Sequence, residues 1–227
     1  MATGKKKFSV IVAHNATASQ NILADIFRLL TDDGTPFSTD YPDVALPFIL
    51  CNGAYRRIQT YNGTPCKISS TSSRMVFARL EDGDGNPYPT SESVIDTRGI
   101  SSGIRGLKHG TLRPDLVVLD DLQDEETADS PDRIAKLINT INKSIFNVGG
   151  KKKVSILHAG TPIAEDDLIC QLAEDKAWKV SRFPAVTSFP KDWEANGEKG
   201  LWGRYFELFD AEIATDQGHG KSLEFYL

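Results

Sequence analysis

Short apolar runs alternate with amphipathic stretches along most of this chain of 227 residues. Runs rich in β-branched and other apolar residues predict buried strands at 8–14, within 113–126 and at 154–162. Apolar residues at helical spacing predict helices at 17–30 and 130–146. Such alternation is typical of an α/β fold with a largely parallel sheet flanked by helices.

Weaker signals fill the rest of the chain. Thr17 or Ser19 is expected to cap the first helix, and Ser130, followed by proline, the second. The pattern also predicts a short helix around 43–53, a strand pair at 66–70 and 74–80, a turn at 81–89, strands at 93–97 and 178–184, and a helix at 165–175. From about Lys191 the sequence is helix-like and aromatic. We therefore expect an α/β domain over 1–190 and a helical region over 191–227.

Composition excludes several classes of protein. Hydrophobic residues make up 40% of the chain and charged residues 25%, which fits a soluble globular protein. The formal charge of −5 denies the chain a globally basic surface, so a nucleic-acid contact would need a local patch. Three widely spaced cysteines argue against a disulfide framework or a zinc site. We see no apolar stretch long enough to span a bilayer.

Polar residues follow three of the predicted strands: His14–Asn15, Asp120–Asp121 and Gly160–Thr161. Ligands of open α/β sheets bind at the carboxyl ends of the strands, so these residues would converge if the three strands are neighbours. Two lysine triplets, at 5–7 and 151–153, precede strands and are expected at the opposite edge. They are either solvated lead-ins to the strands or contacts to a phosphate backbone.

Asp120 and Asp121 are the strongest chemical signal in the sequence. A carboxylate at the end of a buried strand can hold Mg²⁺, directly or through water, while a neighbouring acid polarises the attacking water. This is the arrangement of a Walker B strand. The alternative is that these acids only supply the approach to the next helix, whose positive end favours Asp and Glu.

The stretch GHGKS at 218–222 resembles the end of a phosphate-binding loop. Such a loop has a glycine where this chain has Thr215, a buried strand before it and a helix after it. Here a predicted helix precedes it, so Gly218 and Gly220 are better explained as a helix C-cap and a turn. No other Gly-Lys-Ser or Gly-Lys-Thr occurs, so the loop that a Walker B strand requires is not found in this sequence.

Residues 101–137, SSGIRGLKHGTLRPDLVVLDDLQDEETADSPDRIAKL, resemble the Walker B region of the large terminase subunit of tailed bacteriophages, the motor that packs DNA into a prohead. Residues 155–172 resemble the family's coupling segment, a strand ending in Gly-Thr-Pro before a helix with paired acids. Residues 8–26 resemble the strand and helix that follow the family's phosphate loop. The stretch 201–209 is similar to the segment leading out of the ATPase domain, so the resemblance spans nearly the whole chain.

The resemblance implies a P-loop NTPase-like sheet of the ASCE type that is apparently incomplete. The family's phosphate loop would precede Met1, and its RNase H-type nuclease domain would begin beyond Leu227. Residues 1–190 would be a partial ATPase domain, and 191–227 a helical linker towards the nuclease. We expect the phosphate-loop strand of this fold beside the Walker B strand, so its removal would leave unpaired strand edges and a less stable chain.

The resemblance also assigns roles to individual residues. Asp120 would hold Mg²⁺, and Asp121 or a later acid, Glu125 or Glu126, would orient the attacking water. Arg105 would either stabilise the charge that develops during phosphoryl transfer or form a structural salt bridge. The residues implied to bind the nucleotide are Asn15, Gly160 and Thr161, and the threonine would sense the γ-phosphate.

The implied function is hydrolysis of ATP, with Mg²⁺, to move double-stranded DNA into the prohead, although this chain alone is expected to be inactive. Its partners would be double-stranded DNA, the portal protein, the small terminase subunit and further copies in a homo-oligomeric ring, with no membrane. It would act in the host cytoplasm, transiently at the portal, and not in the mature virion. Two alternatives stay open: a non-enzymatic α/β interaction module with structural carboxylates, and another P-loop NTPase, such as a helicase, with its phosphate loop on a separate chain.

Overall fold

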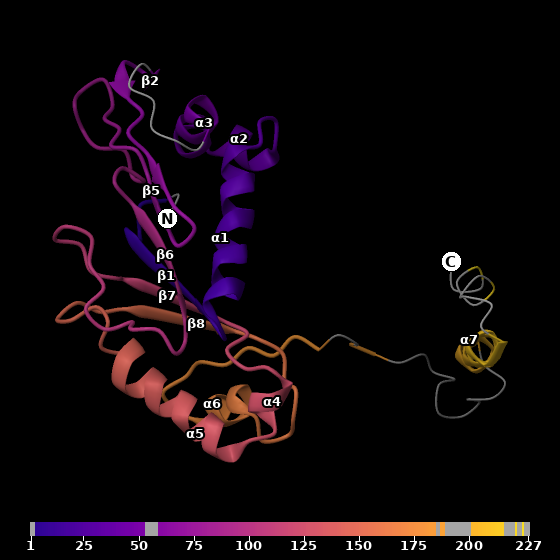
Figure 1. Cartoon of the computed structure of the whole chain (residues 1–227). Helices are drawn as coiled ribbons and strands as arrows, with labels where there is room; N and C mark the ends of the chain where they lie inside the picture. The colour runs from indigo at the N-terminus through magenta and orange to yellow at the C-terminus, as the bar shows by residue number, and fades with distance from the viewer. Residues whose placement is uncertain are drawn as a thin grey trace. The chain divides into compact units, whose positions relative to one another are not determined.

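A single mostly parallel sheet organises the structure, a computed structural model that describes residues 3–52, 59–184, 187–188, 201–215, 221 and 224. Its strand order is β4-β5-β6-β1-β7-β8 (Figure 1). The strands are β1 (Phe8–Ala13), β4 (Ser69–Ser70), β5 (Arg74–Val76), β6 (Val94–Gly99), β7 (Leu116–Asp120) and β8 (Ser155–Ala159). The last four in this order, from β6 to β8, run parallel, whereas β5 is antiparallel to both of its neighbours. The predicted α/β fold is thereby confirmed.

Helices cover both faces of the sheet around β1, which explains why every residue of that strand is apolar or small and buried (Figure 1). Side chains alternate along a strand, so Val10 joins one core cluster and Ile11 the other. The first cluster includes residues of α5 (Pro131–Thr140), η1 (Ile141–Ile145) and α6 (Leu168–Glu174). The second includes residues of α1 (Ala16–Thr31) and α3 (Pro42–Cys51). Each large apolar side chain that these clusters bury contributes about 1.5–3 kcal/mol.

The remaining described elements are short or lie outside the sheet. They are α2 (Pro36–Asp40), α4 (Glu125–Ala128), the two-stranded pair β2 (Thr60–Tyr61) and β3 (Thr64–Pro65), and α7 (Leu201–Thr215). The chain divides into two compact units, Met1–Lys179 and Val180–Leu227. In the described part of the chain, no helix is both long enough and apolar enough to cross a membrane. Of the stretch 218–222, only Lys221 is described.

Several local predictions are wrong in their details. Asn15, not Thr17 or Ser19, caps α1, because its side-chain oxygen accepts a hydrogen bond of 2.8 Å from the backbone N–H of Ala18. Ser130 is the N-cap residue of α5 and a proline follows it, as predicted, but its side chain makes no capping hydrogen bond. The strand predicted at 178–184 does not form, since that segment has no regular structure.

Strand order corrects one expectation about the sheet. β7 lies between β1 and β8 and pairs with both, so there is no room beside this strand for a phosphate-loop strand. Among the described residues, the open edges of the sheet are β4 and β8 instead. The position expected beside the Walker B-like strand is therefore filled by this chain's own β1 and β8.

Candidate functional site

The carboxyl ends of β1, β7 and β8 lie side by side because the three strands are parallel neighbours. Asn15 follows the first, Asp121 the second and Gly160 the third. The register places Asp120 opposite Ala159, and the backbone N–H of Asp121 donates to the Ala159 carbonyl over 3.2 Å. The three polar strand ends singled out in the sequence thus meet at one edge of the sheet.

Asp121 has an unusual backbone conformation at this edge. Its φ of 38° lies in the left-handed region, which costs a non-glycine residue about 1–2 kcal/mol. The side chain lies close to Gly160, because a Cβ added to that glycine would be 3.3 Å from Asp121 Oδ1. Because Gly160 has no side chain, the Asp121 carboxylate fits beside it. Strained residues of this kind are concentrated at functional sites.

Two acids of the segment after β7 have structural partners. Asp124 caps α4 and accepts a hydrogen bond of 2.9 Å from the Thr127 backbone, and its bonds with Thr127 hold the pKa of Asp124 below its ordinary value. Glu126 Oε1 lies 2.6 Å from Arg133 Nη2, and this hydrogen-bonded ion pair lowers the pKa of Glu126. Neither carboxylate is free to take up another role without losing these contacts.

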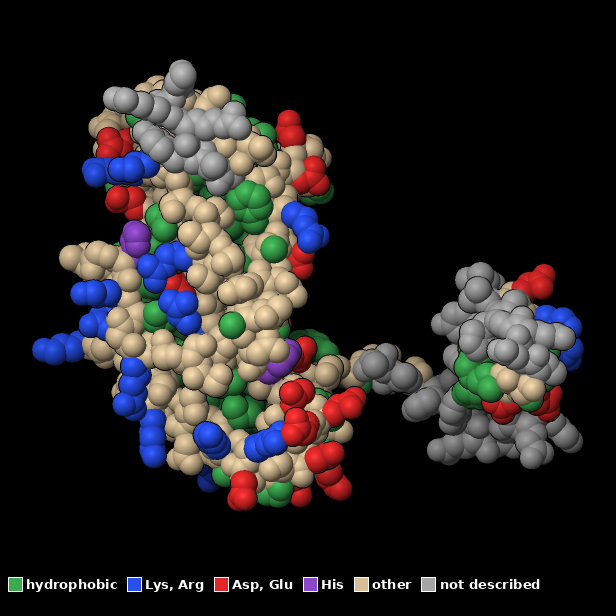
Figure 2. All heavy atoms as spheres, in the orientation of Figure 1, with side chains coloured by type: hydrophobic (Ala, Val, Ile, Leu, Met, Phe, Trp, Pro, Cys, Tyr) green, Lys and Arg blue, Asp and Glu red, His purple; other side chains and the backbone are tan. Residues whose placement is uncertain are grey.

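Other acids at the edge have no such partner. The carboxylates of Asp120, Asp121 and Glu125 accept no hydrogen bond from any residue that the structure describes. Figure 2 shows acidic side chains gathered near α4 and α6, on the side of the sheet to which β7 and β8 point. Of the acids predicted to hold Mg²⁺ or orient water, Asp120, Asp121 and Glu125 are therefore left available, whereas Glu126 is held by Arg133.

A buried hydrogen-bond network joins the segment after β7 to the segment after β8. Asp167 is fully buried and accepts hydrogen bonds from the backbone of Ile163 (2.7 Å) and Cys170 (3.0 Å). Gln123 Nε2 donates to Asp167 Oδ2 over 2.8 Å, and Gln123 Oε1 accepts from the backbone of Leu168 over 2.9 Å. Burial alone would raise the pKa of Asp167, but its backbone hydrogen bonds outweigh burial and lower the pKa.

Sequence reasoning missed this network. Asp167 caps α6, and an aspartate directly before a helix is a recognisable signal. Gln123 carries no comparable signal, because its partner lies 44 residues further along the chain. The pair ties the segment after β7 to the chain between Ile163 and Cys170, just after Gly160 and Thr161.

His158 on β8 was also missed. Burial lowers the pKa of His158, although the carboxylates of Asp121, Asp120 and Asp167 oppose this effect. Its ring lies beside that of Trp178, with the centroids 6.4 Å apart. The lowered pKa therefore favours the neutral form of this imidazole.

The other predicted residues occupy different surroundings. The Asn15 side-chain oxygen is used as the cap of α1, and Thr161 is exposed. Arg105 Nη2 donates to the backbone carbonyl of Lys143 in η1 over 2.7 Å. Within the described part of the chain, this contact ties Arg105 to a helix rather than to a carboxylate.

The carboxyl-end edge of the sheet offers few protein ligands for a divalent cation. No cluster of three or more His, Cys, Asp or Glu side chains suited to a metal ion occurs among the described residues. Mg²⁺ is nevertheless commonly held by one or two carboxylates together with waters and substrate phosphates. Asp120 and Asp121 could supply the one or two carboxylates of that mode.

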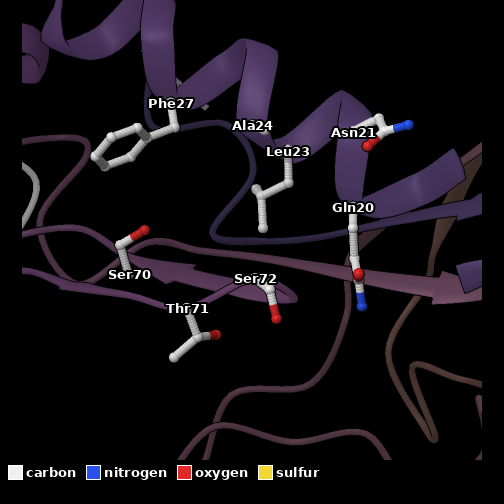
Figure 3. A pocket seen from close by; sticks show the side chains of 8 residues that line it. All are labelled: Gln20, Asn21, Leu23, Ala24, Phe27, Ser70, Thr71 and Ser72. Carbon is white, nitrogen blue, oxygen red and sulfur yellow. The ribbon is translucent and has the colours of Figure 1, made fainter. Parts of the chain in front are cut away.

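A pocket of about 360 Å³ lies elsewhere, between α1 and the turn that joins β4 to β5 (Figure 3). Leu23 and Phe27 point from the helix towards the other side of the pocket, which is lined by Ser70 at the end of β4 and by Thr71 and Ser72 of the turn. No charged side chain lines the pocket. It is therefore suited neither to a metal ion nor to a phosphate.

No protein-family model matches the chain, and a search of curated proteins gave no match. Function is therefore inferred from the residues, their geometry and the sequence resemblance described above.

Proposed function

We propose that this chain supplies the Mg²⁺-binding and coupling residues of an ATP-driven motor that moves double-stranded DNA into a viral prohead, as the large terminase subunit does. One observation carries the proposal: at the carboxyl end of the parallel strand β7, Asp120 and Asp121 have no hydrogen-bond partner for their carboxylates among the described residues, and Asp121 lies beside Gly160, which follows β8. Nucleotide-hydrolysing enzymes with such sheets hold the metal of the nucleotide at this position.

Each residue has a role in this proposal. Asp120 would hold Mg²⁺, which would supply positive charge to offset that of the phosphates. Asp121 would orient the attacking water, with Glu125 as the alternative, and Thr161 would contact the γ-phosphate. Arg105 would have to give up its hydrogen bond to the Lys143 carbonyl before it could stabilise charge on a phosphate.

The Gln123–Asp167 network would couple the two segments. Gln123 follows the carboxylate pair, and Asp167 holds the backbone of Ile163 shortly after Gly160 and Thr161. A shift of one segment would therefore be transmitted to the other through the two hydrogen bonds of Gln123. In a motor, such a link would convert a change at the γ-phosphate into movement of α6.

A phosphate-binding loop has to reach the same edge. Both sides of β7 are occupied, whereas β8 has no partner on its outer side among the described residues, and Leu157 of β8 is 57% exposed. The strand that carries the loop would therefore pair with β8, on a preceding segment of the protein or on a separate chain. Its loop would then lie next to Gly160 and Thr161.

The metal assignment is tested with Mn²⁺ as a paramagnetic substitute for Mg²⁺, added to the isotope-labelled chain. We expect selective broadening of amide resonances at 119–122 and 159–161, and its loss in Asp120→Asn. Asp132→Asn is the matched control, because Asp132 is an exposed acid in the first turn of α5. Broadening that is unchanged in Asp120→Asn would refute the assignment.

Calorimetry with Mg-ATP tests where the phosphate loop lies. We expect no tight binding to residues 1–227 alone. Tight binding that is lost in Lys221→Ala would instead make GHGKS a working phosphate loop.

A non-enzymatic interaction module is the second candidate, and one observation favours it. Asp124, Glu126 and Asp167 all have structural partners, so acids of this edge do serve to build the fold. Broadening by Mn²⁺ that follows only the exposed acids of α4 and α5 would support this second function.

A further inference from the structure

A buried carboxylate in the middle of β6 holds two arginines on one face of the sheet. Asp96 is fully buried and lies directly opposite Arg74 of β5. Arg74 Nε donates to Asp96 Oδ2 over 2.6 Å, and Arg74 Nη2 contacts the same oxygen. Arg98 Nη2 lies 3.0 Å from Asp96 Oδ1. Because side chains alternate along a strand, Asp96 and Arg98 share a face, which Arg74 joins from the neighbouring strand.

The cluster contains more positive charge than its buried carboxylate requires. One arginine would neutralise Asp96, so the second leaves the group with an excess of one positive charge. The arginines are not fully buried, since the side chains of Arg74 and Arg98 are 32% and 26% exposed. Both guanidiniums therefore reach the surface beside a carboxylate that does not.

Several donors of these guanidiniums are also spare. Each guanidinium has five N–H donors. Arg74 uses Nε and Nη2 on Asp96, and Arg98 uses Nη2 on Asp96 and Nη1 on the backbone carbonyl of Thr97. Within the described residues, the other N–H groups have no acceptor. The carboxylate thus fixes the two planar groups without exhausting their hydrogen-bonding capacity.

We propose that Arg74 and Arg98 form a binding site for a phosphate oxyanion. A phosphate matches the spare donors of a guanidinium fork and offsets the excess charge. Asp96 holds the arginines in place in advance, which reduces the entropy lost on binding. None of the proposed ATPase residues takes part, so this site goes beyond the proposed function. A free phosphate or nucleotide and the backbone of a nucleic acid share this chemistry.

The same unit also has a basic side, which favours an anion. Figure 2 shows Lys and Arg side chains gathered along one side of the unit, away from the acids near α4 and α6. The exposed basic residues of the loops that follow β6 and precede β7 and β8 are Arg105, Lys108, Arg113, Lys151, Lys152 and Lys153. The chain therefore has a local basic side despite its net charge of −5, and this side would attract a polyanion.

Two probes test the site on the full chain: inorganic phosphate, followed by chemical-shift titration, and a short labelled DNA duplex, followed by fluorescence anisotropy at two salt concentrations. The test variant is Arg98→Gln, which leaves Asp96 paired with Arg74. The matched control is Arg79→Gln, which removes the same charge from an exposed pair with Glu81. We expect Arg98→Gln to weaken binding at least about tenfold, and Arg79→Gln less than about twofold.

The two probes distinguish the source of the phosphate. Loss of binding to inorganic phosphate alone assigns the site to free phosphate or nucleotide. Loss of duplex binding, with a salt dependence reduced by about one phosphate contact, assigns it to a nucleic-acid backbone. Arg98→Lys keeps the charge and should show an intermediate loss of binding affinity. This variant also tests the site if Arg98→Gln fails to fold. Equal affinities of Arg98→Gln and Arg79→Gln for both probes would overturn the proposal.

Discussion

Replacing Asp167 by alanine removes the acceptor at the centre of the network that joins the segments after β7 and β8. The loss of the cap of α6 costs about 1 kcal/mol. The backbone N–H of Ile163 and the amide of Gln123 lose a buried acceptor, at about 1–3 kcal/mol each. Because such losses are not additive, we expect the free energy of unfolding to fall by about 3–5 kcal/mol. Asp167→Asn keeps an oxygen at the cap and should cost about 1–2 kcal/mol.

Urea denaturation measures these differences, with Asp166→Ala as the control. Asp166 is exposed, and its carboxylate accepts no hydrogen bond within the described chain, so its replacement should change stability by less than about 0.5 kcal/mol. A double-mutant cycle of Asp167→Asn with Gln123→Ala should give a coupling of about 0.5–3 kcal/mol. Equal stabilities of Asp167→Ala and Asp166→Ala would refute the structural role of the network.

The pH dependence of the same variants provides a second test. The pKa of Asp167 is lower in the folded chain than in an unfolded one, so the carboxylate stabilises the fold above the unfolded value of about 3.9. That contribution is lost as the pH falls from there through the lowered pKa. The difference in stability between the wild type and Asp167→Asn should therefore shrink below about pH 4.

Four further changes have definite expected outcomes. Gly99→Ala should cost about 1–3 kcal/mol in urea denaturation, because its Cβ would lie 2.7 Å from the backbone N of Ala16, whereas Gly103→Ala meets no atom within 4 Å and should be nearly neutral. Asp121→Gly relieves the left-handed backbone and should stabilise the fold by up to about 1 kcal/mol; a clear loss would mean that this carboxylate is structural. His158→Gln should abolish a decline in melting temperature as the pH falls below about 6.5, because a lowered folded pKa makes protonation of this histidine oppose folding. A longer chain that supplies a strand to β8 should melt at a higher temperature than residues 1–227, and equal or lower melting would refute the idea that this edge is incomplete.

Hydrophobic periodicity predicted the centre of the fold well. β1, β7 and β8 form where apolar runs predict them, because an uninterrupted apolar run is stable only when both faces of a sheet are covered. The segment 178–184 shows the limit of this reasoning. Its alternation is that of a strand, but the described segment pairs with none, and Phe183 is 90% exposed. A pattern predicts which face is apolar and says nothing about whether a partner strand is available.

The sequence predicted where the site lies, but it did not predict which of its acids form structural contacts and which stay available. Strand ends converge because parallel neighbours end at one edge, which requires only the order of β1, β7 and β8. Which acids stay free depends on backbone N–H groups and on a single arginine, which sequence does not position. Asp124 accepts a hydrogen bond from the first turn of α4, and Glu126 pairs with Arg133. Asp120 and Asp121 come earlier in the chain and take part in neither contact.

The outer edge of β8 connects these features. Ile156 packs against the core, whereas Leu157, which faces the opposite side of the sheet, is 57% exposed. An exposed apolar edge strand invites pairing with another strand, and charged residues beside such a strand oppose unwanted pairing. Lys151–Lys153 lie just before β8 and supply such charges. This edge therefore combines an apolar strand with charged residues that oppose non-specific pairing with other strands. A partner that brings acidic or phosphate groups to the lysines at the start of β8, and a strand to Leu157, would satisfy both features at once, and it would run along the outer edge of β8 towards Gly160 and Thr161 at its other end.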